Sequence, residues 1–219
     1  EVLEDSAGNG GAAVSAYAAA GGLRATIMAP ESTSPAKTVA MRAAGATVEL
    51  IPGNRQATSD AAEARAAATF YASHNWHPFF LQGTKTLAYE LWEDLGFRAP
   101  DVVIVPTGAG SNVLGCDIGF NELLRRGEIA RLPRIYAVQP ANCAPIAAAF
   151  DAGTSTPVPV EVKPTIAEGT AIAEPIRLGP VLDAIRRSRG RSSRLLSSSL
   201  PAASTRSRPA PLLRRRTPD

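Results

Sequence analysis

Residues 101–115 read DVVIVPTGAGSNVLG, a continuous apolar run followed by a glycine-rich turn and the start of a helical pattern. A continuous apolar run of this length is typical of a parallel strand that is covered on both faces. A glycine-rich turn between such a strand and a helix is well suited to hold a phosphate group, because backbone N–H groups and the helix dipole favour an anion there. The turn matches neither the dinucleotide-binding fingerprint nor the nucleotide-binding loop that ends in Lys-Ser/Thr, and a turn without any ligand is the alternative.

Strands and helices alternate on both sides of this segment. Short β-branched runs predict strands, and longer alanine-rich stretches with helical periodicity predict helices between them. The predicted strands outside the opening segment are ATIMAP at residues 25–30, TVELIP at 47–52 and RIYAVQP at 134–140. The predicted helices cover residues 12–20, 35–45, 56–70, 84–96 and 111–124. This order predicts the α/β class, with right-handed crossovers that place parallel strands side by side.

The strand and helix pattern restarts after residue 73, which divides the chain into two predicted lobes. We expect a small α/β lobe at residues 1–73 and part of a large α/β lobe at residues 74–187. Each lobe is expected to have three layers around a mainly parallel sheet, with a cleft between the lobes.

The last segment, residues 188–219, differs from the rest in composition. It holds eight arginines and one aspartate, a net +7, whereas the whole chain carries +3, so the remainder carries −4. It contains no lysine, glutamate or aromatic residue, and it is predicted to be a disordered Arg/Ser/Pro-rich tail. Its abrupt onset leads to the hypothesis of a reading-frame error in the coding sequence. A basic arm that binds nucleic acid non-specifically is the alternative, but no nucleic-acid partner is predicted for the acidic body.

Membrane, disulfide and metal sites are not expected. No apolar run is long enough to cross a bilayer, and residues 1–11 lack the basic and apolar parts of a signal peptide. A cytoplasmic protein with no membrane partner is therefore expected. Cys116 and Cys143 would then stay reduced, and His74 and His77 lack a recognisable zinc spacing, so no metal site is predicted.

A second glycine-rich motif, SAGNGG at residues 6–11, follows VLED and precedes a predicted helix. Its glycines allow backbone N–H groups to point at a carboxylate or phosphate. The alternative is an ordinary strand-to-helix turn in which Ser6 or Asn9 caps the helix. Physical reasoning from these residues alone favours that alternative.

Five segments in unbroken order resemble the fold-type II pyridoxal-phosphate (PLP) enzymes, the tryptophan synthase β-like superfamily. They are EDSAGNGGAAVSAYAAAGG, FLQGTKTLAYELWEDLG, VPTGAGSNVLG, VQPANCAPI and TIAEGTAI, and the resemblance covers residues 1–185. The segment that contains GTKT is similar to the threonine-synthase-like branch. The resemblance implies pyridoxal 5'-phosphate as the cofactor and a small amino-acid substrate.

The resemblance also implies roles for residues in three of these segments. Asn9 would hydrogen-bond the 3′-hydroxyl of the pyridoxal ring, and Glu168 and Gly169 would lie near one edge of that ring. The substrate α-carboxylate would be bound by Ser6, Ala7, Gly8 and Gly10. The cofactor phosphate would be bound by Thr107, Gly108, Ala109, Gly110, Ser111 and Asn112.

The sequence departs from the family pattern at the lysine that forms the Schiff base with PLP. In these enzymes that lysine precedes the asparagine loop, in a segment that this sequence does not contain. No catalytic residue is therefore assigned, and the chain is expected to be an inactive fragment. Lys37, Lys85 and Lys163 are the only lysines, and each is interpreted as a surface charge.

The reaction implied for the intact enzyme is the conversion of O-phosphohomoserine to threonine, in amino-acid biosynthesis, by a PLP-dependent lyase. A threonine or serine ammonia-lyase uses the same loops and is the first alternative. A non-catalytic fragment that binds PLP or phosphate is the second. The family commonly forms dimers, which makes a homodimer of the intact enzyme a further expectation.

Overall fold

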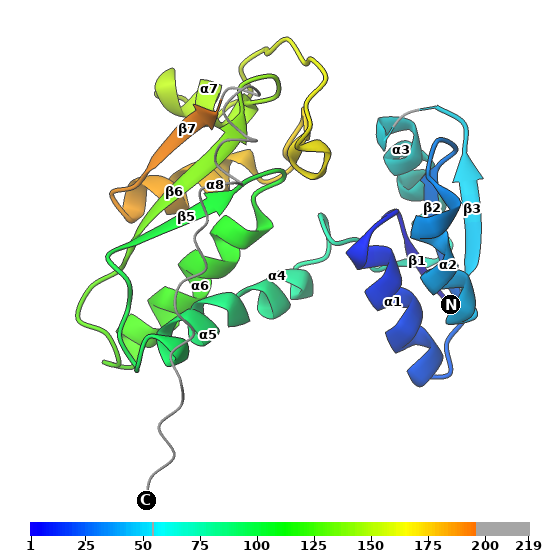
Figure 1. The fold of residues 1–219 in the computed structure, drawn as a ribbon, viewed down its shortest axis with the longest axis horizontal. Helices are drawn as coiled ribbons and strands as arrows, with labels where there is room; N and C mark the ends of the chain where they lie inside the picture. Colours follow the sequence, from blue (N-terminus) through cyan, green and yellow to red (C-terminus); the bar gives the residue numbers. More distant parts are fainter. Residues whose placement is uncertain (54, 196–219) are drawn as a thin grey trace, which may run out of the picture. The chain divides into compact units, whose positions relative to one another are not determined.

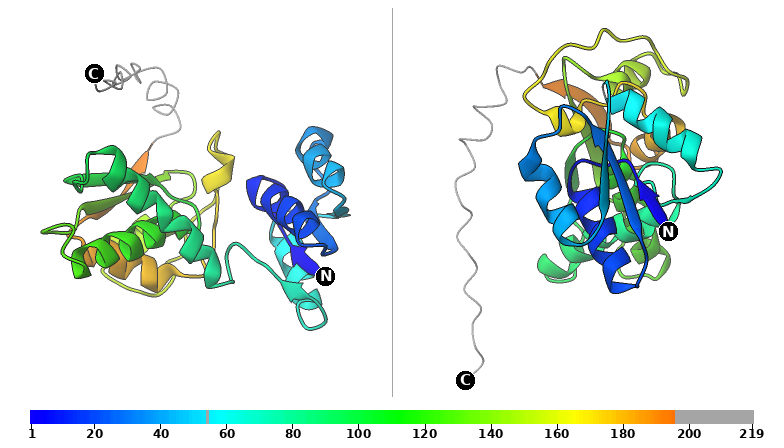
Figure 2. Two further views of the ribbon diagram at one scale, coloured as in Figure 1. Left: turned by 90° about the horizontal axis from the view of Figure 1, so that it is seen from below. Right: turned by 90° about the vertical axis from the view of Figure 1, so that its right-hand side faces the viewer.

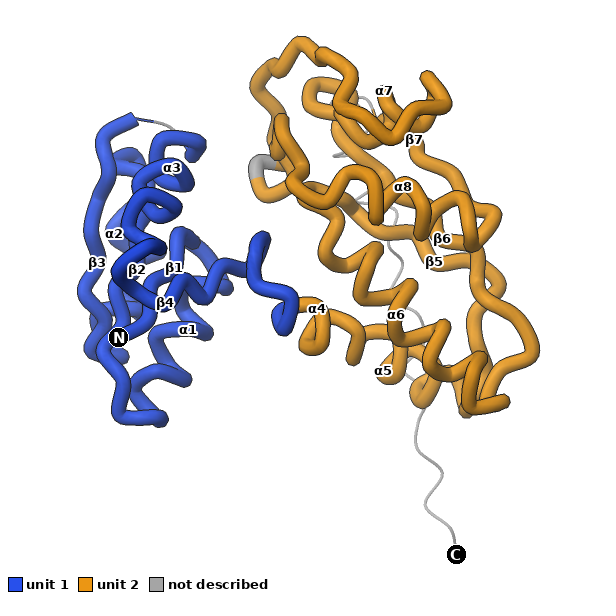
Figure 3. Tube along the Cα trace, turned by 180° about the vertical axis from the view of Figure 1, so that it is seen from behind, with its two compact units in different colours: residues 1–80 blue, residues 81–219 orange. Residues whose placement is uncertain are grey.

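The computed structural model describes residues 1–53 and 55–195, without the side chain of Glu168. The chain forms two compact units, Glu1–Phe80 (unit 1) and Leu81–Asp219 (unit 2), which Figure 3 colours separately. Both units are built from helices around parallel strands, which confirms the predicted α/β class. The boundary follows Phe80 instead of residue 73, because His74 contacts Glu4 and Phe80 within unit 1.

Unit 1 holds a four-stranded sheet in the order β3-β2-β1-β4, in which every pairing is parallel. Its elements are β1 (Val2–Glu4), α1 (Asn9–Ala20), β2 (Ala25–Pro30), α2 (Pro35–Ala43), β3 (Thr47–Ile51), α3 (Arg55–Arg65) and β4 (Phe70–Tyr71). Figure 1 labels the first three of these strands, Figure 3 also labels β4, and Figure 2 gives two further views of the ribbon. Strand β1 lies inside the sheet, between β2 and β4, and the SAGNGG loop follows its carboxyl end.

Alternate residues of β2 pack on opposite faces of this sheet, as the period of two in a strand requires. Ile27 packs with Ala18 of α1 and Met41 of α2. The next residue, Met28, packs with Ala62 of α3. Helices α1 and α2 therefore cover one face and α3 covers the other, which gives unit 1 three layers.

Unit 2 holds a three-stranded parallel sheet in the order β5-β6-β7. Helix α4 (Phe79–Thr84) spans the unit boundary. The elements that follow are α5 (Thr86–Asp94), β5 (Val102–Pro106), α6 (Ser111–Arg125), β6 (Arg134–Pro140), α7 (Pro145–Asp151), the 3-10 helix η1 (Glu168–Thr170), α8 (Leu178–Arg187) and β7 (Arg191–Leu195). No helix in residues 1–53 and 55–195 is long and apolar enough to cross a membrane.

The core of unit 2 lies on one face of its sheet. Val105, Ile135 and Ala137 belong to one buried cluster with residues of α6 and α8. Ile104 points to the opposite face and is 67% exposed. The prediction that this strand is covered on both faces is therefore wrong for the described residues, because β5 is an edge strand there with its core contacts on one side only.

Two element boundaries in unit 1 differ from the predicted ones. Helix α1 begins at Asn9, within the glycine motif, instead of at residue 12. Helix α3 ends at Arg65, and the last residue predicted for it, Phe70, instead forms β4 with Tyr71 beside β1. Strand pairing supplies backbone partners to that side of β1, and this long-range contact outweighs the local helical pattern.

Residues 188–195 correct the prediction that the chain is disordered from Ser188 onward. Strand β7 pairs in parallel with β6 although its sequence, RSSRL, has no apolar run. Only Ser192 of this strand is buried, so backbone hydrogen bonds carry the contact and the composition held no signal for it. Residues 196–219, the remainder of the predicted tail, lie outside the described residues.

Gly190 lies so close to β6 that a Cβ atom there would be 1.7 Å from the Ile135 carbonyl oxygen. We expect Gly190→Ala to displace β7 from β6 and to lower the free energy of unfolding by about 1–3 kcal/mol or more. Gly179→Ala is the matched control, because its Cβ would meet no non-local atom closer than 4.0 Å. Urea unfolding of both variants checks this, and an unchanged midpoint for G190A contradicts the close contact between β6 and β7.

Candidate functional site

The glycine-rich loop of unit 2 joins β5 to α6, at the carboxyl end of the strand. Thr107 anchors the loop, since its N–H donates to the Val138 carbonyl at 2.8 Å and its hydroxyl donates to the Val105 carbonyl at 2.7 Å. Thr107 is only 1% exposed. Its hydroxyl hydrogen is therefore used inside the protein, and the residue fixes the start of the loop.

Two glycines allow the loop to fit between its neighbours. Gly110 has a φ of 95°, and a Cβ atom there would lie 2.4 Å from Val181 Cγ2 on α8. A Cβ atom on Gly108 would lie 3.2 Å from the Gly169 carbonyl oxygen and from Thr170 Cα, both in η1. The loop is therefore held between η1 and α8, and the structure brings Gly169 next to the predicted phosphate-binding residues.

The first turn of α6 has free backbone donors. The Leu114 N–H donates to the Gly110 carbonyl at 3.0 Å, and no side chain among the described residues caps the helix. Within the described residues, the N–H groups of residues 111–113 have no acceptor. Free donors at a helix N-terminus bind anions well, because the helix dipole adds positive potential there. The loop and these N–H groups therefore fit a phosphate group, with the side chains of Ser111 and the exposed Asn112 beside them.

The GTKT segment fixes the position of α6. A Cβ atom on Gly115 would lie 2.7 Å from the Thr84 carbonyl oxygen, and one on Gly119 would lie 2.6 Å from the Lys85 carbonyl oxygen. Helix α6 therefore packs directly against the backbone of this segment. The Thr84 hydroxyl also lies 3.4 Å from the Ser111 carbonyl oxygen at the start of α6. The segment that resembles the family's GTKT helix thus contacts the first turns of α6 and fixes where the loop ends.

Lys85 is not the surface charge that the sequence predicted. Its Nζ lies 3.0 Å from Glu122 Oε1, and its side chain is only 19% exposed. The Tyr89 hydroxyl donates to the same carboxylate. The hydrogen bond from Tyr89, and to a smaller extent that from Lys85, holds the pKa of Glu122 below its ordinary value. Lys85 therefore forms an ion pair that joins the start of α5 to α6. Lys37 and Lys163 are exposed as predicted.

The SAGNGG loop of unit 1 joins β1 to α1. Gly8 is the N-cap of α1, and neither Ser6 nor Asn9 caps the helix with its side chain, so the alternative in which one of them does so is wrong. Ser6 Oγ instead accepts the Gly8 N–H at 3.3 Å. A Cβ atom on Gly11 would lie 2.1 Å from the Ser6 carbonyl oxygen, so the loop folds back tightly at a position that only glycine fits.

The N-terminus of α1 also has free donors. The Ala12 N–H donates to the Gly8 carbonyl at 3.1 Å, and the N–H groups of residues 9–11 have no acceptor among the described residues. Asn9 is exposed, and its side chain has no partner in the part of the chain that the structure describes. This loop can therefore bind a carboxylate through its backbone and a hydroxyl through the Asn9 amide.

A buried charge cluster at the end of β1 was not predicted from the sequence. Glu4 and Asp5 are both 0% exposed. Glu4 Oε1 lies 2.5 Å from His74 Nδ1, and the Arg55 guanidinium lies 2.5 Å from Asp5 Oδ2. Burial raises the pKa of Glu4, although the contact with His74 opposes this. Recognition of β4 could have found the cluster, because β1 and β4 are neighbours and their carboxyl ends meet at one edge of the sheet.

The same cluster is the group in the described residues with metal-ligand spacing. Glu4, Asp5 and His74 each offer one ligand atom, all within 4.8 Å of one another. The Arg55 guanidinium already neutralises Asp5, and it would repel a cation placed beside it. The contacts therefore favour an ion-pair network that fixes the end of β1 and the start of the SAGNGG loop.

The raised pKa of Glu4 predicts a pH-dependent stability of unit 1. The folded state favours the protonated carboxyl, so this stabilisation is full below the ordinary pKa of glutamate and is lost as the pH rises through the raised value. Glu4→Gln removes the titration. The unfolding midpoint of E4Q, relative to that of the unsubstituted chain, should be higher at about pH 8 than at about pH 5.

Glu31→Gln, at an exposed position of the same unit, is the matched control and should show a constant relative midpoint. A relative midpoint of E4Q that stays constant or falls with pH contradicts the desolvated state of the Glu4 carboxyl.

Comparison with known proteins identifies the family. The family model described as "Pyridoxal-phosphate dependent enzyme" matches residues 1–198. The match extends beyond residue 185, where the predicted resemblance ended, and it includes β7. Threonine synthase of Methanocaldococcus jannaschii is 32% identical over 187 residues, which are 84% of this chain and 46% of that protein. Threonine synthase of Mycobacterium tuberculosis is 31% identical over 193 residues, 87% of this chain and 51% of that protein. The chain thus spans about half the length of the curated relatives it matches.

Solved structures support the fold. The crystal structure of T.th. threonine deaminase superposes with a TM-score of 0.76 at 23% identity, over 93% of this chain and 64% of that one. Maize serine racemase superposes with a TM-score of 0.74 at 20% identity, over 93% of this chain and 59% of that one. With the family match over residues 1–198 and the two loops in place, the chain belongs to the family of pyridoxal-phosphate dependent enzymes.

Proposed function

We propose that this chain is part of a threonine-synthase-like enzyme that converts O-phosphohomoserine to threonine. Curated relatives that are 28–32% identical over at least 84% of this chain are named threonine synthases. The observation that carries the proposal is the set of free N–H donors that follows the glycine loop of unit 2. PLP, when bound, supplies an electron sink for reactions at the substrate carbons.

In unit 2, the backbone donors of residues 111–113 would hold the cofactor phosphate. Ser111 and Asn112 would add a hydroxyl and an amide to these donors. Gly108 and Gly110 would contribute by letting the loop pack against η1 and Val181 in the conformation that leaves these donors free. Ala109 would contribute through its backbone. Thr107, whose hydroxyl hydrogen is committed to a carbonyl, would act mainly by fixing the loop.

Glu168 and Gly169 would lie near one edge of the pyridoxal ring. The support for this assignment is the close packing of Gly169 on Gly108. A Cβ atom on Gly108 would lie 3.2 Å from the Gly169 carbonyl oxygen. A segment that touches the phosphate loop is close enough to reach the ring that the phosphate carries.

In unit 1, the exposed amide of Asn9 would hydrogen-bond the ring hydroxyl. The substrate α-carboxylate would accept hydrogen bonds from the backbone of the loop formed by Ser6, Ala7, Gly8 and Gly10. The free N–H groups of residues 9–11 support this role, since a carboxylate is the kind of anion that a helix N-terminus stabilises.

Two alternatives share these loops. A threonine or serine ammonia-lyase would bind PLP with the same residues. A non-catalytic protein that binds PLP or phosphate would also keep them, and we propose this state for the chain by itself. Its support is that Lys85 is held by Glu122, while Lys37 and Lys163 lie on the surface. From the family resemblance we also propose a cytoplasmic location and a homodimer for the intact enzyme.

The phosphate assignment predicts that the unsubstituted chain binds PLP in a saturable way. Ser111→Ala/Asn112→Ala removes two side-chain partners and should weaken PLP binding by about tenfold. The measurement is a titration of the full chain followed by PLP absorbance and fluorescence. Ser193→Ala, an exposed serine on β7 of the same unit, is the control and should bind like the unsubstituted chain. An identical affinity for S111A/N112A, or no saturable binding at all, contradicts the assignment.

Borohydride reduction of the same samples separates the enzyme-like state from the non-catalytic one. We expect no single lysine-containing peptide to carry the reduced cofactor. Mass spectrometry that finds the label on one unique lysine overturns the proposal that Lys37, Lys85 and Lys163 form no specific Schiff base.

A further inference from the structure

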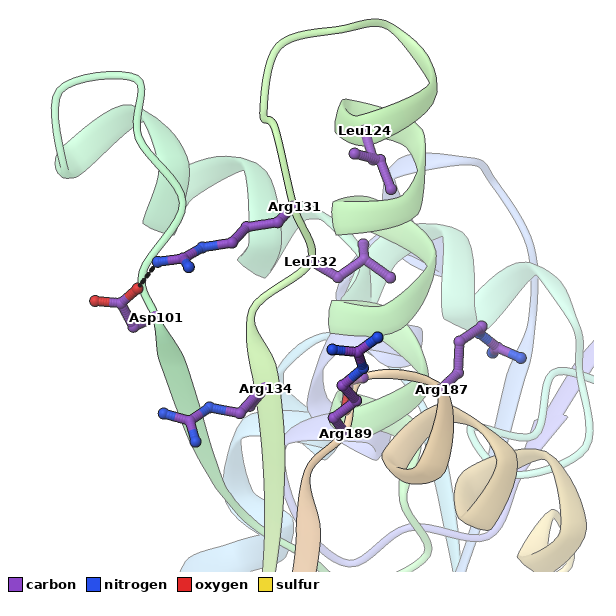
Figure 4. A pocket seen from close by; sticks show the side chains of 8 residues that line it. Asp101, Leu124, Arg131, Leu132, Arg134, Arg187 and Arg189 are labelled. Carbon is purple, nitrogen blue, oxygen red and sulfur yellow. Dashed lines mark hydrogen bonds and ion pairs between the residues drawn. The ribbon is translucent and has the colours of Figure 1, made fainter.

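The amino ends of the unit 2 strands carry arginines that the phosphate loop does not use. Val102 of β5 pairs with Arg134 of β6, and the β6–β7 register, extended back by two residues, brings Arg189 into the same row. A pocket of about 560 Å³ opens at this end of the sheet. Its lining includes Arg131, Arg134, Arg187, Arg189, Leu124 and Leu132 (Figure 4).

Two of these arginines are neutralised by nearby carboxylates. Arg131 lies 2.5 Å from Asp101, and both side chains are largely exposed. Arg187 lies 2.6 Å from Asp117, a nearly buried residue on α6, so this pair ties α8 to α6. Their positive charges are therefore already matched within unit 2.

Arg134 and Arg189 keep their charges unmatched. Both are exposed, and within the described residues neither guanidinium has an ion pair or hydrogen bond. Both residues line the pocket. In Figure 4 their side chains extend in different directions, that of Arg134 on the side of Asp101 and that of Arg189 on the side of α6.

The backbone holds Arg189 in an uncommon conformation. Its φ of 56° is in the left-handed region, which a residue with a side chain rarely adopts. Ser188 fixes the preceding turn, because its hydroxyl accepts the Ile135 N–H at 3.0 Å and donates to the Ile185 carbonyl at 2.8 Å. Gly190 packs directly on the Ile135 backbone on the other side. Arg189 is thus held at the pocket by contacts on both sides of it.

The lining indicates the class of ligand. Guanidinium groups bind phosphate oxygens in pairs, more specifically than an ammonium group does. None of the described residues that line the pocket is aromatic, so they offer a nucleobase no ring to stack on. The two leucines offer a short apolar surface, and the volume is within the range of small-molecule sites. We propose that this pocket is a second anion site, which binds a small phosphorylated metabolite through Arg134 and Arg189.

The proposed site is separate from the phosphate loop. The loop follows the carboxyl end of β5, whereas Asp101 and Arg134 lie at the amino ends of β5 and β6. A strand of five residues, at about 3.3 Å per residue, puts roughly 16 Å between these two edges. One phosphate group cannot contact both.

Calorimetric titration with inorganic phosphate at low ionic strength tests the site in the full chain. The unsubstituted chain should bind phosphate saturably, and Arg134→Gln/Arg189→Gln should weaken this binding by about tenfold or more. The matched control is Arg98→Gln/Lys37→Gln, which removes two exposed positive charges outside the pocket and should retain the affinity within about twofold. Inorganic phosphate should also bind at the phosphate loop, so S111A/N112A should weaken that second binding event and leave the one that depends on Arg134 and Arg189.

Three results overturn the proposal. One is phosphate binding that R134Q/R189Q leaves unchanged, or that R98Q/K37Q weakens equally, since the effect would then be one of net charge. A second is the absence of any saturable binding up to about 10 mM phosphate, beyond the range of a useful metabolite site. A third is a single phosphate site that S111A/N112A abolishes and R134Q/R189Q leaves intact, because the phosphate would then bind only at the loop.

Discussion

Val181 of α8 packs so closely on Gly110 that no other residue fits at the turn into α6. This contact, with that of η1 on Gly108, fixes the backbone between β5 and α6 from two sides. The first N–H groups of α6 have no acceptor among residues 1–53 and 55–195, and the fixed loop leaves them at the carboxyl end of β5. A phosphate group bound there, as proposed, would gain hydrogen bonds without any rearrangement of the chain. The proposed role of unit 2 depends on this preorganised turn.

The loop of unit 1 follows the same design with different supports. Gly11 closes on the Ser6 carbonyl, and α1 starts with uncapped donors. The residues that support this loop are charged. Glu4 and Asp5 are buried, and they contact His74 and Arg55 respectively. Buried ion pairs are weak evidence for stability, since desolvation offsets their attraction. Here these ion pairs fix the end of β1, where the loop that carries Asn9 begins.

Much of this arrangement could be predicted from local sequence patterns. The strands at residues 25–30 and 134–140 and the helix that starts at Ser111 follow from apolar runs and glycine punctuation. The two-residue strand β4 and the strand β7 could not be predicted, because their stability comes from pairing with β1 and β6 across long sequence separations. The Glu4–His74 contact was missed for the same reason. Roles of single residues in the loops came from the family resemblance, since free backbone donors are visible only in three dimensions.

The ³¹P NMR spectrum of PLP bound to the full chain tests the central claim most directly. A phosphate monoester loses its second proton near pH 6 in water, and free N–H donors should favour the dianion. The account predicts a distinct bound resonance that stays at the dianion position as the pH falls from about 8 to about 6. A PLP resonance that keeps the shift and the titration of free PLP in the presence of excess protein would contradict it.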